Sequence, residues 1–169
     1  VQAEEMAPLW WHNSQSSLPE LFMTNSKVEV ATEPVGTRYV ATDPATPFVL
    51  HQSDWRAESP ASSSSAAAVD FDKDGDLAMF VGGRVLPDQW PLAAPSRLFV
   101  NEGGNLVDVT AVAAPDLLNL GMATGSLWSD MDSDGDLDLV VPCGRFDVAR
   151  APQPARGAAQ GKHDGGHQQ

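Results

Sequence analysis

The sequence predicts an all-β protein made of antiparallel sheets. An aspartate-rich phrase occurs twice, at Asp70–Val81 and Asp130–Val141, and each copy ends in a short apolar stretch that favours a buried strand. Several other segments alternate polar and apolar residues with a period of two, as half-buried strands do. A third indication lies in Arg97–Thr110, where a Gly-Gly turn signal separates two strand-like segments in the pattern of a β-hairpin.

The first 55 residues are predicted to contribute further strands. Short strand-like segments occur at Lys27–Thr32, Thr37–Thr42 and Phe48–His51. Turn signals separate them at Pro34–Gly36 and Asp43–Pro44. Strands spaced by roughly 8–12 residues favour an all-β arrangement in this part of the chain as well.

Strands are also expected on both sides of each aspartate phrase. Before the first phrase, the serines of Ser59–Ala68 are predicted to form a loop that passes into a strand through Ala66–Val69. Gly82–Arg84 is expected to leave the strand that follows, and Pro87–Pro95 should be irregular because it is rich in proline. Gly121–Trp128 is the corresponding strand before the second phrase.

Between the two phrases lies the predicted hairpin, with strands at Arg97–Val100 and Leu106–Thr110 and a turn at Asn101–Asn105. Ala111–Leu120 is then a crossing loop or one short helical turn. About four strands therefore separate the two phrases, which lie 60 positions apart. A self-similar period of this length is typical of repeat architectures, with one propeller blade or half a sandwich per period.

Four tryptophans and one cysteine are candidates for the core. Trp10, Trp11, Trp55 and Trp90 are alternatives for a contact surface, but core packing is the expected use of each. Cys143 has no internal disulfide partner and is expected to be a small buried residue.

The aspartate phrases have the composition of loops that bind a hard cation. Carboxylates at alternating positions gather on the inside of a tight turn, and Ca²⁺ takes about six to eight oxygen ligands. The sixth position is Gly75 or Gly135, which suits a sharp bend. In the second loop the proposed ligands are the carboxylates of Asp130, Asp132, Asp134 and Asp138 and the backbone carbonyl of Asp136. The first loop offers the carboxylates of Asp70, Asp72 and Asp74 and the carbonyl of Asp76.

The two loops differ at the ninth position, where Ala78 of the first loop stands in place of Asp138 of the second. The first site is therefore expected to be weaker. An EF-hand is excluded, because it needs a glutamate at the twelfth position and flanking helices, whereas Val81 and Val141 occupy that position here. The alternative interpretation of each phrase is an acidic, solvated turn.

Charge and composition exclude several functions. The net charge of −13 argues against binding to nucleic acid or to an anionic membrane surface. Nine of the 23 acidic residues lie in the two loops, which accounts for much of this charge. No apolar run approaches the roughly 18 residues of a membrane-spanning helix, so no membrane insertion is expected. No nucleophile-and-base motif is present, so the chain is not expected to be an enzyme.

These residues resemble the FG-GAP/VCBS repeat. The resemblance rests on the aspartate loops, on the hairpin Leu98–Thr110, on the strand leading into Asp130, and on Val81–Pro87, which is similar to a segment of ASPIC/UnbV-type proteins. It covers roughly residues 66–145. The resemblance implies partial β-propeller blades made of four-stranded antiparallel sheets, as in integrin α-subunits, with a structural Ca²⁺ in the loop between the first two strands of a blade.

The resemblance also implies a function and a location. It implies a calcium-binding, non-catalytic module for adhesion or for binding an unidentified protein or carbohydrate, at an extracellular, periplasmic or cell-surface location. The alternative is a fragment of a propeller-type hydrolase or lyase whose catalytic residues lie outside this chain. Two clear repeats are fewer than such propellers contain, so further blades of a longer chain, or self-association, are expected.

The chain is expected to divide into three parts. Residues 1–55 form a β-rich segment that is a candidate degenerate blade, and residues 56–148 contain the repeats. Residues 149–169 form a tail rich in Pro, Gly, Ala and Gln that is expected to be disordered.

Overall fold

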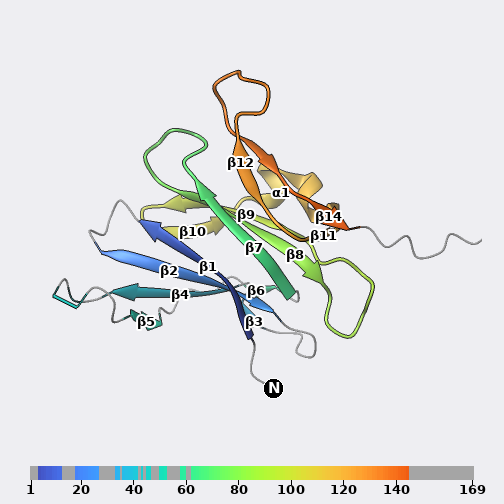
Figure 1. Ribbon diagram of the computed structural model, residues 1–169, viewed down its shortest axis with the longest axis horizontal. Helices are drawn as coiled ribbons and strands as arrows, with labels where there is room; N and C mark the ends of the chain where they lie inside the picture. The colour runs from blue at the N-terminus through green and yellow to red at the C-terminus, as the bar shows by residue number, and fades with distance from the viewer. Residues whose placement is uncertain are drawn as a thin grey trace, which may run out of the picture.

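The computed structural model describes residues 4–12, 18–26, 33–34, 36–41, 43, 45–46, 50–52, 58–59 and 62–144. Almost all regular structure in these ranges is antiparallel β (Figure 1), which confirms the predicted fold class. The strand predicted at Lys27–Thr32 and the predicted tail 149–169 lie outside the described residues.

The first four-stranded sheet, here called the N-terminal sheet, has the strand order β1-β2-β4-β5. Its strands are β1 (Glu4–His12), β2 (Pro19–Ser26), β4 (Gly36–Ala41) and β5 (Leu50–Gln52). Strand β4 confirms the prediction at Thr37–Thr42, and β5 overlaps the predicted Phe48–His51. A separate two-stranded pair joins β3 (Glu33–Pro34) to β6 (Glu58–Ser59).

Two strands of the N-terminal sheet were not predicted, and their residues explain why. Strand β1 contains a register shift between Glu5 and Pro8, which breaks its period of two. Strand β2 buries Glu20 and Thr24 on the same side as Phe22, so its inward face is mostly polar. These polar groups find partners only in the folded chain, because Glu20 pairs with Arg38 and Thr24 Oγ1 donates to the carbonyl of Ser64.

The second four-stranded sheet, the central sheet, has the order β10-β9-β8-β7. Its strands are β7 (Ser62–Val69), β8 (Ala78–Val85), β9 (Arg97–Glu102) and β10 (Asn105–Asp108). The hairpin of β9 and β10 confirms the prediction. Its two-residue turn has positive φ at both Gly103 (59°) and Gly104 (91°), as a type I′ turn requires.

The serines before the first aspartate loop belong to β7, so the predicted loop there was wrong. The pairing of β7 with β8 shifts register between Ser62 and Ala66, which explains the unusual composition. Ser64 Oγ donates to the carbonyl of Gly82 across this irregular part. Small side chains are therefore used here for a close strand contact.

The glycines after the first loop also stay in a strand, contrary to the predicted exit at Gly82–Arg84, because β8 continues to Val85. A Cβ atom on Gly82 would lie 2.7 Å from Ser64 Oγ and 2.8 Å from Ala123 Cβ. One on Gly83 would lie 2.4 Å from the carbonyl oxygens of Ala94 and Pro95. The glycines admit close packing of neighbouring segments in the middle of the fold.

After the central sheet the chain forms one helical turn, α1 (Thr110–Ala113), and a 3-10 helix, η1 (Pro115–Asn119). This matches the predicted short helical turn. Two short strand pairs follow. Strand β11 (Met122–Ala123) pairs with β14 (Cys143–Gly144), and β12 (Leu127–Ser129) pairs with β13 (Asp138–Val140).

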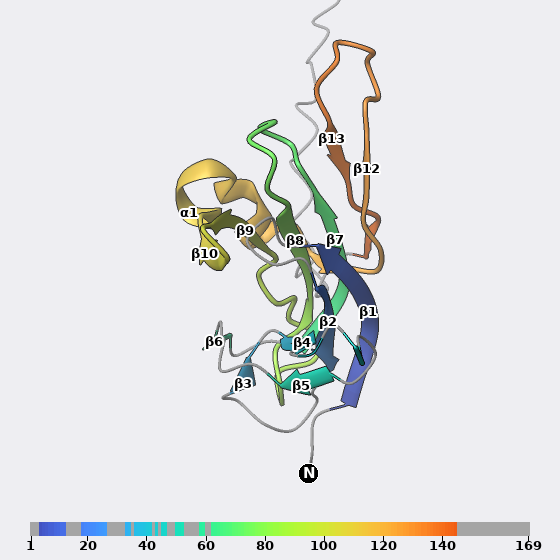
Figure 2. The same cartoon turned by 90° about the vertical axis from the view of Figure 1, so that its left-hand side faces the viewer.

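The central sheet lies between the other β segments (Figure 2). One of its faces packs on the N-terminal sheet through Phe22 of β2 and a cluster of Met79, Val81, Phe99 and Leu106. Phe80 points to the opposite face and is fully buried. Gly82 lies on that face too, directly beneath Ala123 of β11. The three groups of strands are therefore stacked face to face.

The predicted core positions of Trp10, Trp90 and Cys143 were wrong. Leu9 packs against the core, so the alternation of β1 turns the side chain of Trp10 outward, where it is 55% exposed. Trp90 projects from the proline-rich connection before β9 and is 65% exposed. Cys143 is exposed in the short strand β14. Trp55 and the side chain of Trp11 lie outside what the structure describes.

Candidate metal centre

The two aspartate loops occupy equivalent places in the fold. The first joins β7 to β8, and the second joins β12 to β13. The strand registers beside them are identical after a shift of 60 positions: Ala67 pairs with Phe80 as Leu127 pairs with Val140, and Val69 pairs with Ala78 as Ser129 pairs with Asp138. The repeat seen in the sequence is therefore a structural repeat of strand, loop and strand.

The backbones of the loops follow the same path. The sixth-position glycines have φ of 92° at Gly75 and 93° at Gly135. The fourth positions are left-handed as well, with φ of 62° at Lys73 and 64° at Ser133. Such values are uncommon for residues other than glycine. Two segments of different sequence share this bend, so the aspartate spacing and the glycine fix it.

The first aspartate of each loop holds the turn closed. The two carboxylate oxygens of Asp70 accept hydrogen bonds from the backbone N–H groups of Asp74 and Gly75, both at 3.1 Å. In the second loop Asp130 accepts the same two bonds, also at 3.1 Å, from Asp134 and Gly135. These bonds orient the carboxylate toward the inside of the bend before any cation binds.

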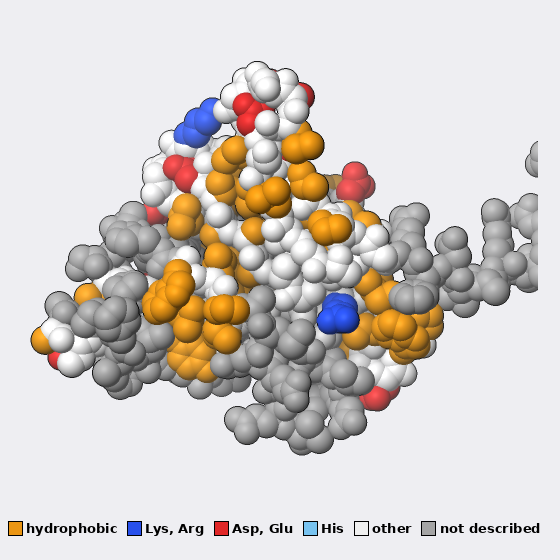
Figure 3. Space-filling model, viewed as in Figure 1, with side chains coloured by type: hydrophobic (Ala, Val, Ile, Leu, Met, Phe, Trp, Pro, Cys, Tyr) orange, Lys and Arg blue, Asp and Glu red, His pale blue; other side chains and the backbone are white. Residues whose placement is uncertain are grey.

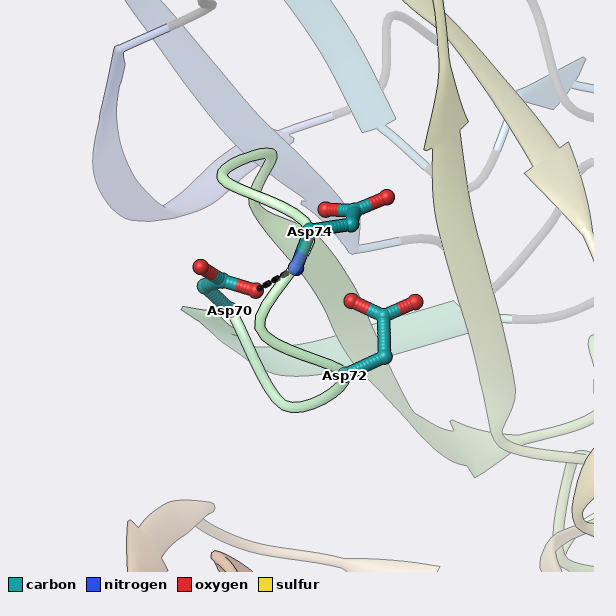
Figure 4. Close-up of side chains that lie close together, drawn as sticks. All are labelled: Asp70, Asp72 and Asp74. Carbon is teal, nitrogen blue, oxygen red and sulfur yellow. Dashed lines mark hydrogen bonds between the residues drawn. The ribbon is translucent and has the colours of Figure 1, made fainter.

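Three carboxylates converge in each loop. Oxygen atoms of Asp70, Asp72 and Asp74 lie within 4.8 Å of one another (Figure 4). In the second loop the convergent group is Asp130, Asp132 and Asp138, so the ninth position takes the place that the fifth has in the first loop. All these side chains are exposed except that of Asp70, which is half-buried. Each group could hold a metal ion, as the spacing predicts.

The other predicted ligands lie beside these groups. Asp134 is not within the convergent set of the second loop, and its Oδ1 accepts a hydrogen bond from the backbone N–H of Asp136 at 2.9 Å. Asp74 Oδ1 accepts the same bond from Asp76 at 2.8 Å. The side-chain oxygen Oδ1 of Asp76 is buried and has no hydrogen-bond partner within the described part of the chain. A buried carboxylate oxygen in that state requires a proton, a water molecule or a cation.

The ninth position distinguishes the loops, as predicted. Asp138 closes the second loop, because its Oδ2 accepts a hydrogen bond from the backbone N–H of Met131 at 3.0 Å and lies with Asp130 and Asp132. Ala78 at the equivalent position is buried and supplies no oxygen from its side chain. The second loop therefore has a side-chain ligand at this position that the first loop lacks.

Two contacts between the two strand–loop–strand units were not predicted. The ammonium group of Lys73 lies 2.9 Å from Asp136 Oδ1 and 3.1 Å from the carbonyl oxygen of Gly135. Its hydrogen bond to Asp136 and the nearby carboxylates raise the pKa of Lys73 above its usual value. Lys73 is the only basic residue in either aspartate loop, and this was the one sign of an ion pair that the sequence offered. Its partner Asp136 lies 63 positions away and cannot be identified from the sequence.

The second contact is aromatic. The ring of Phe71 in the first loop stacks on that of Trp128 in β12, with ring centroids 6.0 Å apart and planes inclined by 6°. Trp128 also donates from Nε1 to the carbonyl of Ala67 at 3.3 Å. These contacts place the second strand–loop–strand unit against the first, so that the two acidic loops lie on the same side of the molecule (Figure 1).

No protein-family model matches the chain, and a comparison with curated proteins finds no match. In the part of the chain that the structure describes, there is also no helix with the length and apolar character needed to cross a membrane.

Proposed function

We propose that this chain is a calcium-binding, non-catalytic module of the FG-GAP/VCBS type, in which Ca²⁺ has a structural role. The observation that carries the proposal is the duplicated loop. Two segments that differ at several positions share one backbone path and the hydrogen bonds of the first aspartate, and each gathers three carboxylates, at positions one, three and five in the first loop and one, three and nine in the second. A solvated acidic turn has no physical reason to repeat all three features.

Electrostatic repulsion supports the same conclusion. Two carboxylates at about 4 Å repel each other by about 1 kcal/mol in water, and by more where solvent is partly excluded. Lys73 is the one cation that the described residues bring to the loops, and it contacts Asp136 of the second loop. We therefore expect a bound cation to neutralise the remaining carboxylates of the two loops.

The donor set fits Ca²⁺ better than softer metals. Carboxylate and carbonyl oxygens suit hard cations, whereas no histidine or cysteine belongs to either group. Asp130, Asp132 and Asp138 would hold the ion in the second loop, and Asp70, Asp72 and Asp74 in the first, with Asp134 and the carbonyls of Asp76 and Asp136 close by. When bound, Ca²⁺ would neutralise these oxygens and fix the bend between paired strands.

The module would act in binding rather than in catalysis. The aspartates stand at alternating positions, and the first of each loop is tied to backbone N–H groups, an arrangement that suits holding an ion better than transferring a proton. By resemblance to the repeat family, we propose adhesion or recognition of a protein or carbohydrate outside the cytoplasm, with calcium concentrations high enough to fill weak sites.

The test is a pair of thermal melts of the whole chain, one in EGTA and one in calcium. If each site binds with an affinity on the order of 10⁻⁴ M, about 10 mM calcium should stabilise the fold by about 2.7 kcal/mol per site. For a chain of this size, the melting temperature should rise by at least about 5 °C.

Magnesium at the same concentration is the control, because it demands near-octahedral geometry and sheds its waters reluctantly. It should give a much smaller shift than calcium. Equal melting temperatures in EGTA and calcium would contradict a structural calcium site. Equal shifts by the two ions would mean that the loops act as a diffuse acidic patch.

A further inference from the structure

The side chain of Lys73 belongs to the first aspartate loop but makes its contacts in the second. Its ammonium group lies 2.9 Å from Asp136 Oδ1 and 3.1 Å from the carbonyl oxygen of Gly135. The hydrogen bond to Asp136 raises the pKa of Lys73 most, followed by the charge of Asp136, with smaller contributions from the charges of Asp134 and Asp130. All these carboxylates lie in the second loop. The positive charge therefore acts on the neighbouring repeat rather than on its own.

The bend of the first loop places this side chain. Lys73 is the fourth residue of the loop and has a left-handed backbone, with φ of 62°. Its counterpart in the second loop is Ser133, which has nearly the same φ of 64° but carries no charge. The relation between the loops is therefore one-sided. Within the ranges that the structure describes, the second loop receives a cation from its neighbour and sends none back.

Lys73 lies beside the proposed calcium position and does not fill it. Its ion pair is with the side chain of Asp136, whereas the predicted ligand is the backbone carbonyl of that residue. Asp136 is also not one of the three convergent carboxylates of the second loop. In Figure 3 basic and acidic side chains meet at the end of the molecule that the two loops form. A positive charge at such a place weakens the attraction between the loop and a divalent cation.

The second loop does not need Lys73 for its shape. The value of φ is 93° at Gly135 and 92° at Gly75, although no lysine or arginine among the described residues forms an ion pair with the first loop. Asp130 also accepts the same pair of backbone hydrogen bonds as Asp70. The effect expected of Lys73 is therefore on the charge of the second site and not on its geometry.

We propose that Lys73 determines the affinity of the second site, as a counter-ion from the first repeat that weakens binding of Ca²⁺ there. The inference rests on the proposed calcium function. The second loop contains five aspartates and the first contains four. Lys73 offsets one charge of the richer loop, so the two sites differ less in affinity than their aspartates alone would make them. Because the contact forms only where the two repeats pack together, the affinity of the second loop depends on its neighbour.

The test measures calcium binding at each loop separately. The full chain is titrated with calcium chloride while the backbone amide signals of Gly75 and Gly135 are followed by NMR, at an ionic strength of about 10 mM. In Lys73→Met, the dissociation constant measured at Gly135 should be roughly three- to tenfold lower than in the unmodified chain, with a smaller change at Gly75. In about 1 M salt the Debye length falls to about 3 Å, and the gain at Gly135 should shrink below about twofold.

Two variants are matched controls. Lys73→Arg keeps the positive charge and can still pair with Asp136, so its dissociation constants should equal those of the unmodified chain. Arg84→Met removes an exposed basic side chain near the opposite end of β8 from the first loop. It lowers the net positive charge by the same amount as Lys73→Met, but it should change the dissociation constant at Gly135 by less than about twofold.

Three outcomes for Lys73→Met would overturn the proposal. An unchanged dissociation constant at Gly135 would show that the ammonium does not affect the second site. A higher one would show that Lys73 holds the loop in its binding shape. Equal gains at Gly75 and Gly135 would show that the charge acts on the whole acidic end of the molecule. Absence of saturable shifts in the unmodified chain would overturn the calcium proposal as well, whereas the other three outcomes leave calcium binding intact.

Discussion

At the scale of single residues, one buried hydroxyl illustrates how the hairpin is fastened. Thr110 is fully buried, and its Oγ1 accepts a hydrogen bond from the backbone N–H of Leu98 at 2.9 Å. The same hydroxyl donates to Asp108, whose carboxylate also accepts the backbone N–H of Thr110. The Asp-Val-Thr ending of the hairpin, seen first as a sequence pattern, is thus a small network that closes β10 onto β9.

Replacing this hydroxyl should be costly. In Thr110→Val the shape is nearly kept, but the buried N–H of Leu98 loses its acceptor. The free energy of unfolding should fall by about 1–3 kcal/mol, measured by urea denaturation. Thr46→Val is the matched control, because Thr46 is exposed and its hydroxyl donates to Asp43 at the surface. Similar losses for both variants would refute the proposed role of the network.

The ninth loop position allows a second test at this scale. Asp138→Ala gives the second loop the composition of the first at that position, so its calcium affinity should fall by roughly tenfold. Isothermal titration calorimetry measures the change. Asp138→Asn, which keeps an acceptor for the N–H of Met131, separates the lost charge from the lost hydrogen bond. An unchanged affinity in the alanine variant would mean that Asp138 closes the loop without binding the ion.

At the scale of elements, two ion pairs join distant parts of the chain and should differ in strength. Arg38 makes two bonds of 2.8 Å to Glu20 and a third of 3.0 Å to the carbonyl of Gly104 in the β9–β10 turn. It links the N-terminal sheet to the central sheet, and both charged side chains are almost buried. Lys73 and Asp136 link the two loops, but both are exposed to solvent.

Breaking the buried pair should destabilise the protein strongly. Arg38→Met leaves the carboxylate of Glu20 buried without its partner, which typically costs about 3–5 kcal/mol. The double variant with Glu20→Leu should regain much of this loss, because neither charge remains buried. Urea denaturation of the single and double variants measures both effects.

Lys73→Met is the comparison for this experiment. Exposed ion pairs are screened by water and salt, so its unfolding curve should stay close to that of the unmodified chain. A large loss of unfolding free energy in Lys73→Met would contradict this expectation. So would a double variant of Glu20 and Arg38 that is no more stable than Arg38→Met. Either result would show that burial does not decide which of the two ion pairs contributes more to stability.

At the scale of the whole molecule, the structure is a stack of sheets whose last member is narrower than the others. The N-terminal and central sheets each have four strands, and β12–β13 has two in the described residues. Val140 is 37% exposed in the narrow pair, whereas its counterpart Phe80 in the central sheet is fully buried. The duplicated loops belong to the last two members of this stack, and the calcium melts test whether they hold a structural ion.

The sequence by itself determined the fold class, the two loops, the hairpin and the difference between Ala78 and Asp138. These features depend on neighbours along the chain: alternation within a strand, glycine at a position of positive φ, and a turn of two residues. Local patterns of this kind are visible without any knowledge of the fold.

Only the tertiary structure decided the rest. Strands β1 and β2 escaped prediction because the irregular register of β1 and the inward polar groups of β2 make sense only beside Arg38 and Ser64. Trp10 proved to be exposed because the face of β1 that meets the core is set by its partner strands. Lys73 meets Asp136, and Phe71 meets Trp128, only where the two strand–loop–strand units pack together. Contacts between residues some 60 positions apart carry no local signal, because their energy arises only when the sheets pack together.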